Sequence, residues 1–211
     1  MLDTLRRKVL NLGAFWISYL KLVPILRQNY HDTIILDCVA NDGKVAQLFA
    51  RTRAEVYAFE PDPVAYRLLQ KRLGDQKKVH CLQKAVWTEH ATLDLYLYPR
   101  HDHGRADFTV SSSLVKEKCN VSDQYKVEVQ AVDLIAFIKN LDKKVAILKM
   151  DVEGAEIKIL ERLIAEEVYK WVGLILVETH ETKIHQQQAP LRAIKASIAR
   201  QNITNIKLNW I

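Results

Sequence analysis

The amino-acid sequence predicts an α/β protein with an open, three-layer, mostly parallel twisted sheet, a Rossmann-like arrangement with an antiparallel addition and an N-terminal helical segment. Short apolar runs alternate with segments of helical periodicity along most of the chain, which indicates parallel strands joined by crossover helices. Several of these runs end in acidic residues followed by a turn. At 211 residues the chain suits one substantial core and is too short for two ordinary domains. We therefore expect a helical extension over residues 1–30 and one domain over 31–211.

The first half of the domain contains three predicted strands. The run from Thr33 to Asp37 is apolar until its last residue, which is typical of a buried parallel strand. The predicted elements that follow are a turn over 41–43, a helix to residue 49, a second strand over 55–60, a helix over 64–73 and a third strand over 78–86.

The second half begins with the antiparallel addition. Residues 92–98 alternate cleanly between apolar and polar side chains, which predicts a strand with one solvated face. Residues 101–120 are polar and Ser-rich, and we expect a loop with a short strand near Leu114. The remaining predicted elements are a strand over 127–132, a helix over 133–140, a strand from 145, a helix after Gly154, a strand over 173–179, a helix over 187–201 and a terminal strand over 203–211.

The beginning of the chain is apolar and aromatic over residues 12–26, but Lys21 and Pro24 interrupt the run. It is too short to span a bilayer and lacks the small-residue cleavage site of a signal peptide. The basic residues at 6–8 allow a second interpretation, peripheral contact with a membrane surface through residues 6–26. We favour a helix that packs on the domain or gates its site, because an apolar helix face is most often part of a core.

Charge and cysteine content exclude some classes of function. The net charge is +6, but Lys and Arg are dispersed in pairs and triplets, and no aromatic-and-basic pattern of an RNA-binding module is present. We therefore predict no nucleic-acid partner. The three cysteines, Cys38, Cys81 and Cys119, have no metal-ligand spacing and form no disulfide framework, which favours reduced thiols and a cytoplasmic location.

The stretch from Lys149 to Glu156 is the most informative part of the chain. It follows an apolar run and places Asp151 and Glu153 before a Gly turn and a helical pattern. In an open parallel sheet, ligands bind outside the carboxyl ends of the strands, so these acids would stand at the rim of a binding site. A simpler interpretation is that Asp151 caps the helix while Glu153 and Glu156 complement its dipole.

Two further acids end the first two predicted strands. Asp37 closes the first strand, and Glu60 closes the second about twenty residues later. A carboxylate in this place can accept hydrogen bonds from both ribose hydroxyls of a nucleoside-bearing cofactor. The turn between them contains one glycine, Gly43, and lacks the G-x-G-x-x-G pattern that holds a pyrophosphate, which disfavours a nicotinamide dehydrogenase. S-adenosylmethionine, which carries no phosphate, suits such a turn better.

Four stretches of the sequence resemble the FkbM-type methyltransferases, which belong to the class I S-adenosylmethionine-dependent fold. These stretches are residues 35–43, 58–63, 148–156 and 175–180, and the resemblance runs from about residue 33 to residue 180. The last two stretches, in this order and spacing, are specific. The resemblance implies S-adenosylmethionine as cofactor and methyl transfer, usually to an oxygen of a small-molecule or glycan acceptor such as a sugar or a secondary metabolite.

The resemblance also implies a cofactor-binding set, which is Asp37, Val39, Asn41, Gly43, Glu60 and Pro61. The family loop normally has Gly where this chain has Val39, and a β-branched residue is a poor replacement where backbone must approach a cofactor closely. This departure motivates an alternative function, a degenerate methyltransferase fold that serves as a binding or scaffold protein. A class I sheet also usually closes with an antiparallel hairpin, whereas a single strand follows the last predicted helix here.

The candidate catalytic residues are Asp151, Glu178 and His180, at predicted strand tips. His180 titrates near neutrality and could remove a proton from an acceptor hydroxyl, although it could equally be a loop-anchoring histidine. Glu178 lies within an apolar strand and needs a partner, for which Lys149 on the neighbouring strand is a natural choice. The three catalytic candidates could also hold a metal ion, but their spacing is not diagnostic, and we predict none.

The polar loop offers further candidates. His101, Asp102, His103 and Arg105 could help to cover the acceptor, and Ser111–Ser113 could contact the substrate or the cofactor. The simpler interpretation of both groups is solvated loop and turn chemistry.

Overall fold

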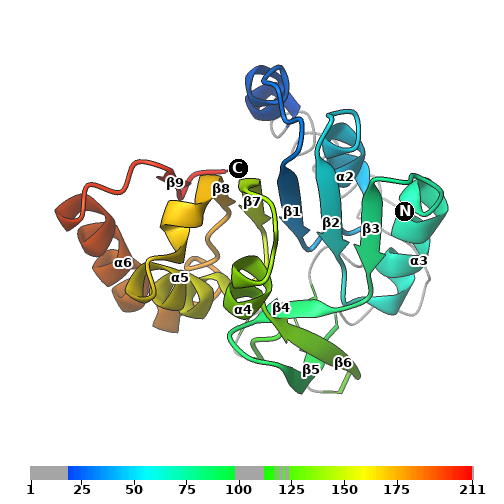
Figure 1. Cartoon of the computed structure of the whole chain (residues 1–211). Helices are drawn as coiled ribbons and strands as arrows, with labels where there is room; N and C mark the ends of the chain where they lie inside the picture. The colour runs from blue at the N-terminus through cyan, green and yellow to red at the C-terminus, as the bar shows by residue number, and fades with distance from the viewer. Residues whose placement is uncertain (1–18, 98–111, 117, 119–120, 122–123, 211) are drawn as a thin grey trace.

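The computed structural model describes residues 19–97, 112–116, 118, 121 and 124–210, and it confirms the predicted α/β architecture. A six-stranded sheet lies at its centre (Figure 1). Its strands are β1 (Ile34–Cys38), β2 (Glu55–Phe59), β3 (Val79–Leu82), β7 (Val145–Met150), β8 (Val172–Val177) and β9 (Ile206–Lys207). They are ordered β3-β2-β1-β7-β8-β9, and every neighbouring pair is parallel.

Helices cover both faces of this sheet. They are α2 (Lys44–Phe49), α3 (Pro63–Leu73), α4 (Leu134–Lys139), α5 (Glu156–Ala165) and α6 (Gln188–Arg200). Side chains of β1 alternate between two cores, because successive residues of a strand point to opposite faces. Ile34 and Leu36 belong to the core shared with α4, α5 and α6, whereas Ile35 belongs to the core shared with α2 and α3. The three-layer arrangement follows directly from this alternation.

A second sheet of three strands accounts for the antiparallel addition. It contains β4 (Ala85–Trp87), β5 (Ala91–Tyr96) and β6 (Lys126–Asp133), in the order β4-β6-β5. The β5–β6 pair is antiparallel, as predicted, and β4–β6 is parallel. The single strand predicted over 78–86 is therefore wrong, because the chain leaves the large sheet after Leu82 and enters the small one at Ala85. Ser113 bridges Tyr96 close to the short strand expected near Leu114.

The described part of the N-terminal extension is helical over 19–26 and packs on the domain, the interpretation that we favoured. Leu22 is fully buried in the core beside α2 and α3. Lys21 Nζ donates hydrogen bonds of 2.8 Å to the carbonyls of Asn209 and Trp210. The basic residues at 6–8 lie outside the described residues. Within the described ranges, no helix has the length and apolar character needed to cross a membrane.

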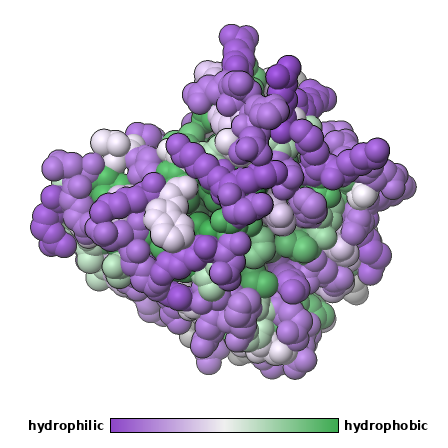
Figure 2. All heavy atoms as spheres, in the orientation of Figure 1, coloured by the Kyte–Doolittle hydropathy of each residue, from purple (hydrophilic) through white to green (hydrophobic). Residues whose placement is uncertain are grey.

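The large sheet ends in β9, which differs from the expected close of a class I sheet. Of the described residues in the terminal strand predicted over 203–211, only two form a strand, and they pair in parallel with β8. Trp210, beyond β9, is buried in the same core as Leu22. Figure 2 shows that hydrophilic residues cover most of one face of the molecule, with apolar residues gathered across its middle.

Candidate active site

The loop after β1 has a left-handed backbone at three positions. The φ angles are 69° at Val39, 50° at Asn41 and 82° at Gly43. For a β-branched residue this conformation is a genuine outlier, and strain of this kind costs on the order of 1–3 kcal/mol. Gly43 has a packing role as well, because a Cβ there would lie 2.8 Å from Leu69 Cδ1 of α3. The expected misfit of Val39 is therefore visible in its backbone.

Asp37 and Lys149 form a buried ion pair beneath this loop. They are opposite each other in the register of β1 and β7, and Lys149 Nζ lies 3.0 Å from Asp37 Oδ1. Lys149 Nζ also donates a 3.1 Å hydrogen bond to the carbonyl of Val39. Burial lowers the pKa of Lys149, but the carboxylates of Asp37 and Asp151 raise it above its ordinary value, so the ammonium stays charged. The predicted pairing of Lys149 with Glu178 is wrong, because Asp37 is the partner.

Glu60 follows β2 and is almost fully buried. Its Oε2 accepts a 2.7 Å hydrogen bond from the Asn41 N–H, and its Oε1 accepts a 2.8 Å hydrogen bond from the Asp62 N–H. Burial raises the pKa of Glu60 to about 8, in spite of these two backbone donors. Each carboxylate oxygen can accept a second hydrogen bond, so Glu60 retains capacity for ligand hydroxyls.

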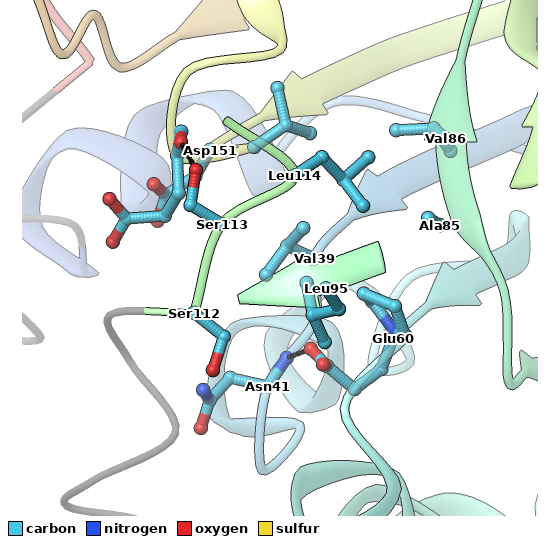
Figure 3. A pocket seen from close by; sticks show the side chains of 13 residues that line it. Val39, Asn41, Glu60, Ala85, Val86, Leu95, Ser112, Ser113, Leu114 and Asp151 are labelled. Atoms are coloured by element: carbon cyan, nitrogen blue, oxygen red, sulfur yellow. Dashed lines mark hydrogen bonds between the residues drawn. The ribbon is translucent and has the colours of Figure 1, made fainter. Parts of the chain in front are cut away.

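A cavity lies at the carboxyl ends of β1, β2 and β7, against the small sheet (Figure 3). Its lining residues are Val39, Asn41, Glu60, Pro61, Ala85, Val86, Leu95, Ser112, Ser113, Leu114, Asp151, Val152 and Glu153. Four members of the predicted cofactor-binding set and one catalytic candidate thus share one cavity. Asp37 and Gly43 do not line it, since the first is buried beneath the loop and the second faces α3.

The opposite wall of the cavity was not predicted. Ala85 and Val86 come from β4, Leu95 comes from β5, and Leu114 comes from the segment that bridges β5. These residues carry no motif, and the alternating pattern of β5 gave no sign that the small sheet faces a cavity. Ser112 and Ser113, which we considered as contacts of the substrate or the cofactor, line the cavity.

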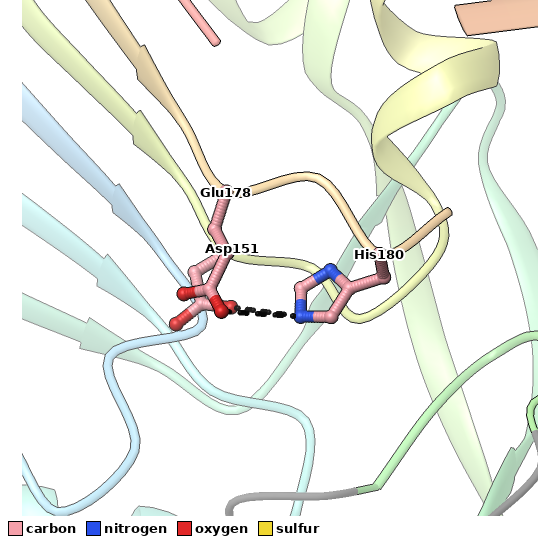
Figure 4. Close-up of side chains that lie close together, drawn as sticks. All are labelled: Asp151, Glu178 and His180. Atoms are coloured by element: carbon pink, nitrogen blue, oxygen red, sulfur yellow. Dashed lines mark ion pairs between the residues drawn. The ribbon is translucent and has the colours of Figure 1, made fainter. Parts of the chain in front are cut away.

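The three catalytic candidates come together at the tips of β7 and β8 (Figure 4). His180 Nε2 lies 3.6 Å from Glu178 Oε1 and 3.7 Å from Asp151 Oδ1. The side chain of His180 is 1% exposed, whereas those of Glu178 and Asp151 are 25% and 27% exposed. The acids are thus reachable from outside, and the imidazole stands behind them.

Glu156 orients His180 from the first turn of α5. It is fully buried, and its Oε1 accepts a 2.9 Å hydrogen bond from the His180 N–H and lies 3.2 Å from His180 Nδ1. Its Oε2 accepts a 2.7 Å hydrogen bond from the Gly154 N–H. The sequence had assigned Glu156 only to the helix dipole. The N-cap position of α5 is Ala155, so the capping role considered for Asp151 is wrong.

Glu153 is held by a lysine that the sequence did not single out. Lys118 Nζ lies 2.6 Å from Glu153 Oε2, and the Lys118 side chain is fully buried. Ser113 Oγ donates a 2.5 Å hydrogen bond to the carbonyl of Glu153, whose backbone is also left-handed. A lysine in a polar stretch has no sequence signal that marks it as buried.

The acids change the proton affinity of this cluster. Burial lowers the pKa of His180, but the hydrogen bond with Glu156 and the charges of Glu153, Glu156 and Asp151 raise it to about 9. Burial and the charge of Asp151 raise the pKa of Glu178 to about 7. His180 therefore holds a proton at neutral pH in this environment, which differs from the expected titration near neutrality.

His101, Asp102, His103, Arg105, Ser111 and Cys119 lie outside the described residues. Cys38 and Cys81 are free thiols.

Comparison with known proteins gives consistent matches over the part of the chain that forms this site. Residues 37–202 match the family model of the methyltransferase FkbM domain. The chain is 26% identical over 174 residues to the 2-O-methyltransferase NoeI of Sinorhizobium fredii, a match that covers 77% of this chain and 70% of that protein. It is 27% identical over 167 residues to methyltransferase 1 of Beauveria bassiana, with 72% of this chain and 66% of that protein covered.

Proposed function

Because this chain belongs to the FkbM family of methyltransferases, we propose that it uses S-adenosylmethionine to methylate a hydroxyl oxygen of a sugar, a glycan or another small molecule. The observation that carries the proposal is that Glu60 and Asp151 line one cavity at the carboxyl ends of β2 and β7. The carboxylate to which we assign the cofactor and the carboxylate to which we assign the acceptor therefore line the same cavity. The 2-O-methyltransferase activity in the name of the relative NoeI supports an oxygen acceptor.

The cavity chemistry fits a nucleoside with no phosphate. Glu60 offers buried acceptor oxygens for ribose hydroxyls, and Val86, Leu95 and Leu114 form an apolar wall suited to an adenine ring. We assign cofactor contacts to Val39, Asn41, Glu60 and Pro61, and a supporting role to Asp37 and Gly43. Asp37 holds Lys149 beneath the loop after β1, and Gly43 allows the turn at the end of that loop.

The acidic cluster would act on the acceptor. When bound, S-adenosylmethionine supplies an electrophilic methyl group whose transfer requires an acceptor oxygen in line with the breaking C–S bond. Asp151 lines the cavity and would receive the proton of the acceptor hydroxyl. The charged His180, which forms ion pairs with both Asp151 and Glu178, would hold the two carboxylates in place.

Calorimetric titration with S-adenosylhomocysteine tests the cofactor assignment. We expect binding to the wild-type protein, no binding of NAD, and affinity weakened by about 1.5–3 kcal/mol in Glu60→Ala, the scale of a hydrogen bond to a charged group. Glu55→Ala is a matched control at the opposite end of β2. Equal affinity in both variants would place the nucleoside elsewhere.

Transfer of a labelled methyl group to a panel of sugars, glycans and cell extract then tests the reaction. The comparisons do not favour the alternative of a degenerate fold that acts as a binding or scaffold protein. Tight cofactor binding with no transfer to any acceptor would reverse that preference.

A further inference from the structure

The cluster of Asp151, Glu178 and His180 has the dimensions of a cation site. One ligand atom from each residue lies within 4.8 Å of the others, and the two contacts of His180 Nε2 measure 3.6 and 3.7 Å. Nitrogen and oxygen ligands lie about 2.0–2.2 Å from a transition-metal ion, so two of them on one ion are roughly 3–4 Å apart. A single ion therefore fits among these three atoms without a large rearrangement.

His180 is oriented as a metal-binding histidine. Its Nε2 atom is buried and forms no hydrogen bond, although it points at Asp151 and Glu178 (Figure 4). Its Nδ1 atom faces the fully buried carboxylate of Glu156, which can only accept a hydrogen bond when ionised. The carboxylate keeps a proton on the far ring nitrogen, so an ion that displaces the Nε2 proton of the charged imidazole would bind the lone pair that this proton leaves.

Direct cationic partners are unevenly distributed over the acids of this cluster. Glu153 approaches His180 Nε2 to 3.1 Å, but Lys118 neutralises it at 2.6 Å. In the part of the chain that the structure describes, Asp151 and Glu178 form ion pairs with His180 alone. Two partly exposed carboxylates thus share one imidazole, and a divalent cation would satisfy both.

We propose that Asp151, Glu178 and His180 bind one divalent cation, with Mn²⁺ as the best-matched ion. Carboxylate oxygens suit Mg²⁺ and Mn²⁺, whereas an imidazole nitrogen favours a transition metal, and Mn²⁺ accepts both kinds of ligand. The proposal differs from our expectation of no metal, which was based on the spacing of these residues in the sequence alone. Three protein ligands leave positions of the ion open to water or to an acceptor.

The role of the ion, unlike its binding, rests on the proposed function. Asp151 also lines the cavity, so the ion would stand beside the acceptor. It would polarise the acceptor hydroxyl and ease the loss of its proton to the second oxygen of Asp151. The oxygen would then form its bond to the methyl carbon as the C–S bond of the sulfonium breaks, with both electrons of that bond leaving on sulfur.

Titration of the full chain with Mn²⁺ alone, followed by electron paramagnetic resonance, tests the site. We expect one ion per chain, with pulsed spectra that show coupling to an imidazole nitrogen. Asp151→Asn and Glu178→Gln should weaken Mn²⁺ binding at least tenfold, and Glu156→Gln should weaken it by about 10–100-fold as the residue behind the ligand. Glu161→Gln and His185→Ala are matched controls on exposed side chains and should leave the affinity unchanged.

The outcomes separate the cation site from the methyltransferase proposal. Absence of a saturable Mn²⁺ site, absence of nitrogen coupling, or equal affinity in Asp151→Asn and His185→Ala would overturn the site, whatever the activity. The wild-type spectrum keeps the test valid if a variant misfolds. Full methyl transfer in the presence of a chelator, together with Mn²⁺ binding, would retain the site and overturn its catalytic role.

Discussion

The ammonium of Lys149 donates a hydrogen bond of 3.1 Å to the carbonyl of Val39, the residue whose backbone is strained at the edge of the cavity. The same ammonium is paired with Asp37 at 3.0 Å. A buried charge on β7 therefore holds the loop after β1 in its left-handed path. Two features of the site, the loop and the ion pair, consequently depend on each other.

Removal of the Lys149 charge should destabilise the fold strongly. Lys149→Met leaves Asp37 as an uncompensated buried carboxylate, and breaking a buried pair in this way costs about 3–5 kcal/mol. Lys143→Met, which breaks a solvent-screened pair with Glu55, should change the free energy of unfolding far less. Chemical denaturation measures both free energies of unfolding. The double variant Asp37→Asn/Lys149→Met should recover part of the loss, and a Lys149→Met protein as stable as the wild type would contradict the importance of the pair.

At position 39, glycine should give a more stable protein than alanine, which reverses the usual order of stability. At a φ of 69° a side chain costs about 1–2 kcal/mol, whereas glycine adopts this conformation freely. Val39→Gly should therefore be more stable than Val39→Ala by about 1 kcal/mol, although glycine adds unfolded-state entropy. Thermal melting compares the two variants. A higher melting temperature for Val39→Ala than for Val39→Gly would mean that the loop carries little strain.

The same substitution bears on the cofactor. Val39 lines the cavity, so Val39→Gly should bind S-adenosylhomocysteine more tightly than the wild type does. If Val39→Ala tightens binding as much as Val39→Gly does, the γ-methyl groups of valine obstruct the cofactor. If only Val39→Gly tightens binding, the strained backbone is the obstacle. Weaker binding in both variants would show that the loop has adapted to valine.

Glu60 should make cofactor affinity depend on pH. Burial raises its pKa to about 8, and ribose hydroxyls would donate to its ionised form. Affinity for S-adenosylhomocysteine should therefore rise by up to about tenfold per pH unit below that value and level off above it. Calorimetry across this range measures the slope, which Glu60→Gln should abolish and Glu55→Gln should retain.

The effect of Glu60 on stability has the opposite sign. A carboxyl whose pKa is raised by folding stabilises the protein below its unfolded pKa, and this contribution is lost as pH rises toward about 8. The melting temperature of the wild type relative to Glu60→Gln should fall over this interval. A constant difference would mean that Glu60 is ionised in the folded protein throughout.

Asp151 should be required for turnover but not for folding, whereas His180→Ala also removes the side-chain partner of the buried Glu156 and should lower turnover and stability together. Asp151→Asn and His180→Ala should lower methyl transfer by about 10²–10⁴-fold, the contribution of a proton-transfer group. Affinity for S-adenosylhomocysteine should stay close to that of the wild type, and His185→Ala, on an exposed histidine nearby, should remain fully active. Full activity in both site variants would reduce Asp151 and His180 to structural residues.

Local patterns were sufficient to predict the parallel sheet, because buried strands and amphipathic helices are written in contiguous residues. They could not predict strand register, which pairs residues distant in sequence. Lys149 was assigned to Glu178 for this reason. Register places Lys149 opposite Asp37, whereas Glu178 lies beyond the last paired residue of β8. The change of sheets between Leu82 and Ala85 was missed because apolar residues continue on both sides of it.

The site residues at strand ends could be predicted from the sequence, whereas those whose roles depend on burial could not. Asp151, Glu178 and His180 were found because the carboxyl ends of parallel strands share one edge. Glu156 and Lys118 look like surface charges in the sequence, yet both are buried and orient the cluster. Only the packing of α5 and of the segment near residue 118 against this edge gives them their roles.

The cavity has one wall from each of the two sheets, and this arrangement has a consequence for local opening. The small sheet has a core of its own, made of Ala85, Leu95, Leu97, Val129 and Ala131, and Val86 and Val132 anchor it to the main core, so we expect its edge strand β5 to open more readily than the large sheet does. A ligand that touches Leu95 and Glu60 together would join the two units. Amide protons of β5 and β6 that exchange through openings of the cavity would then be slowed in proportion to ligand occupancy. The small sheet thereby becomes the part of the molecule whose hydrogen exchange reports on what the cavity holds.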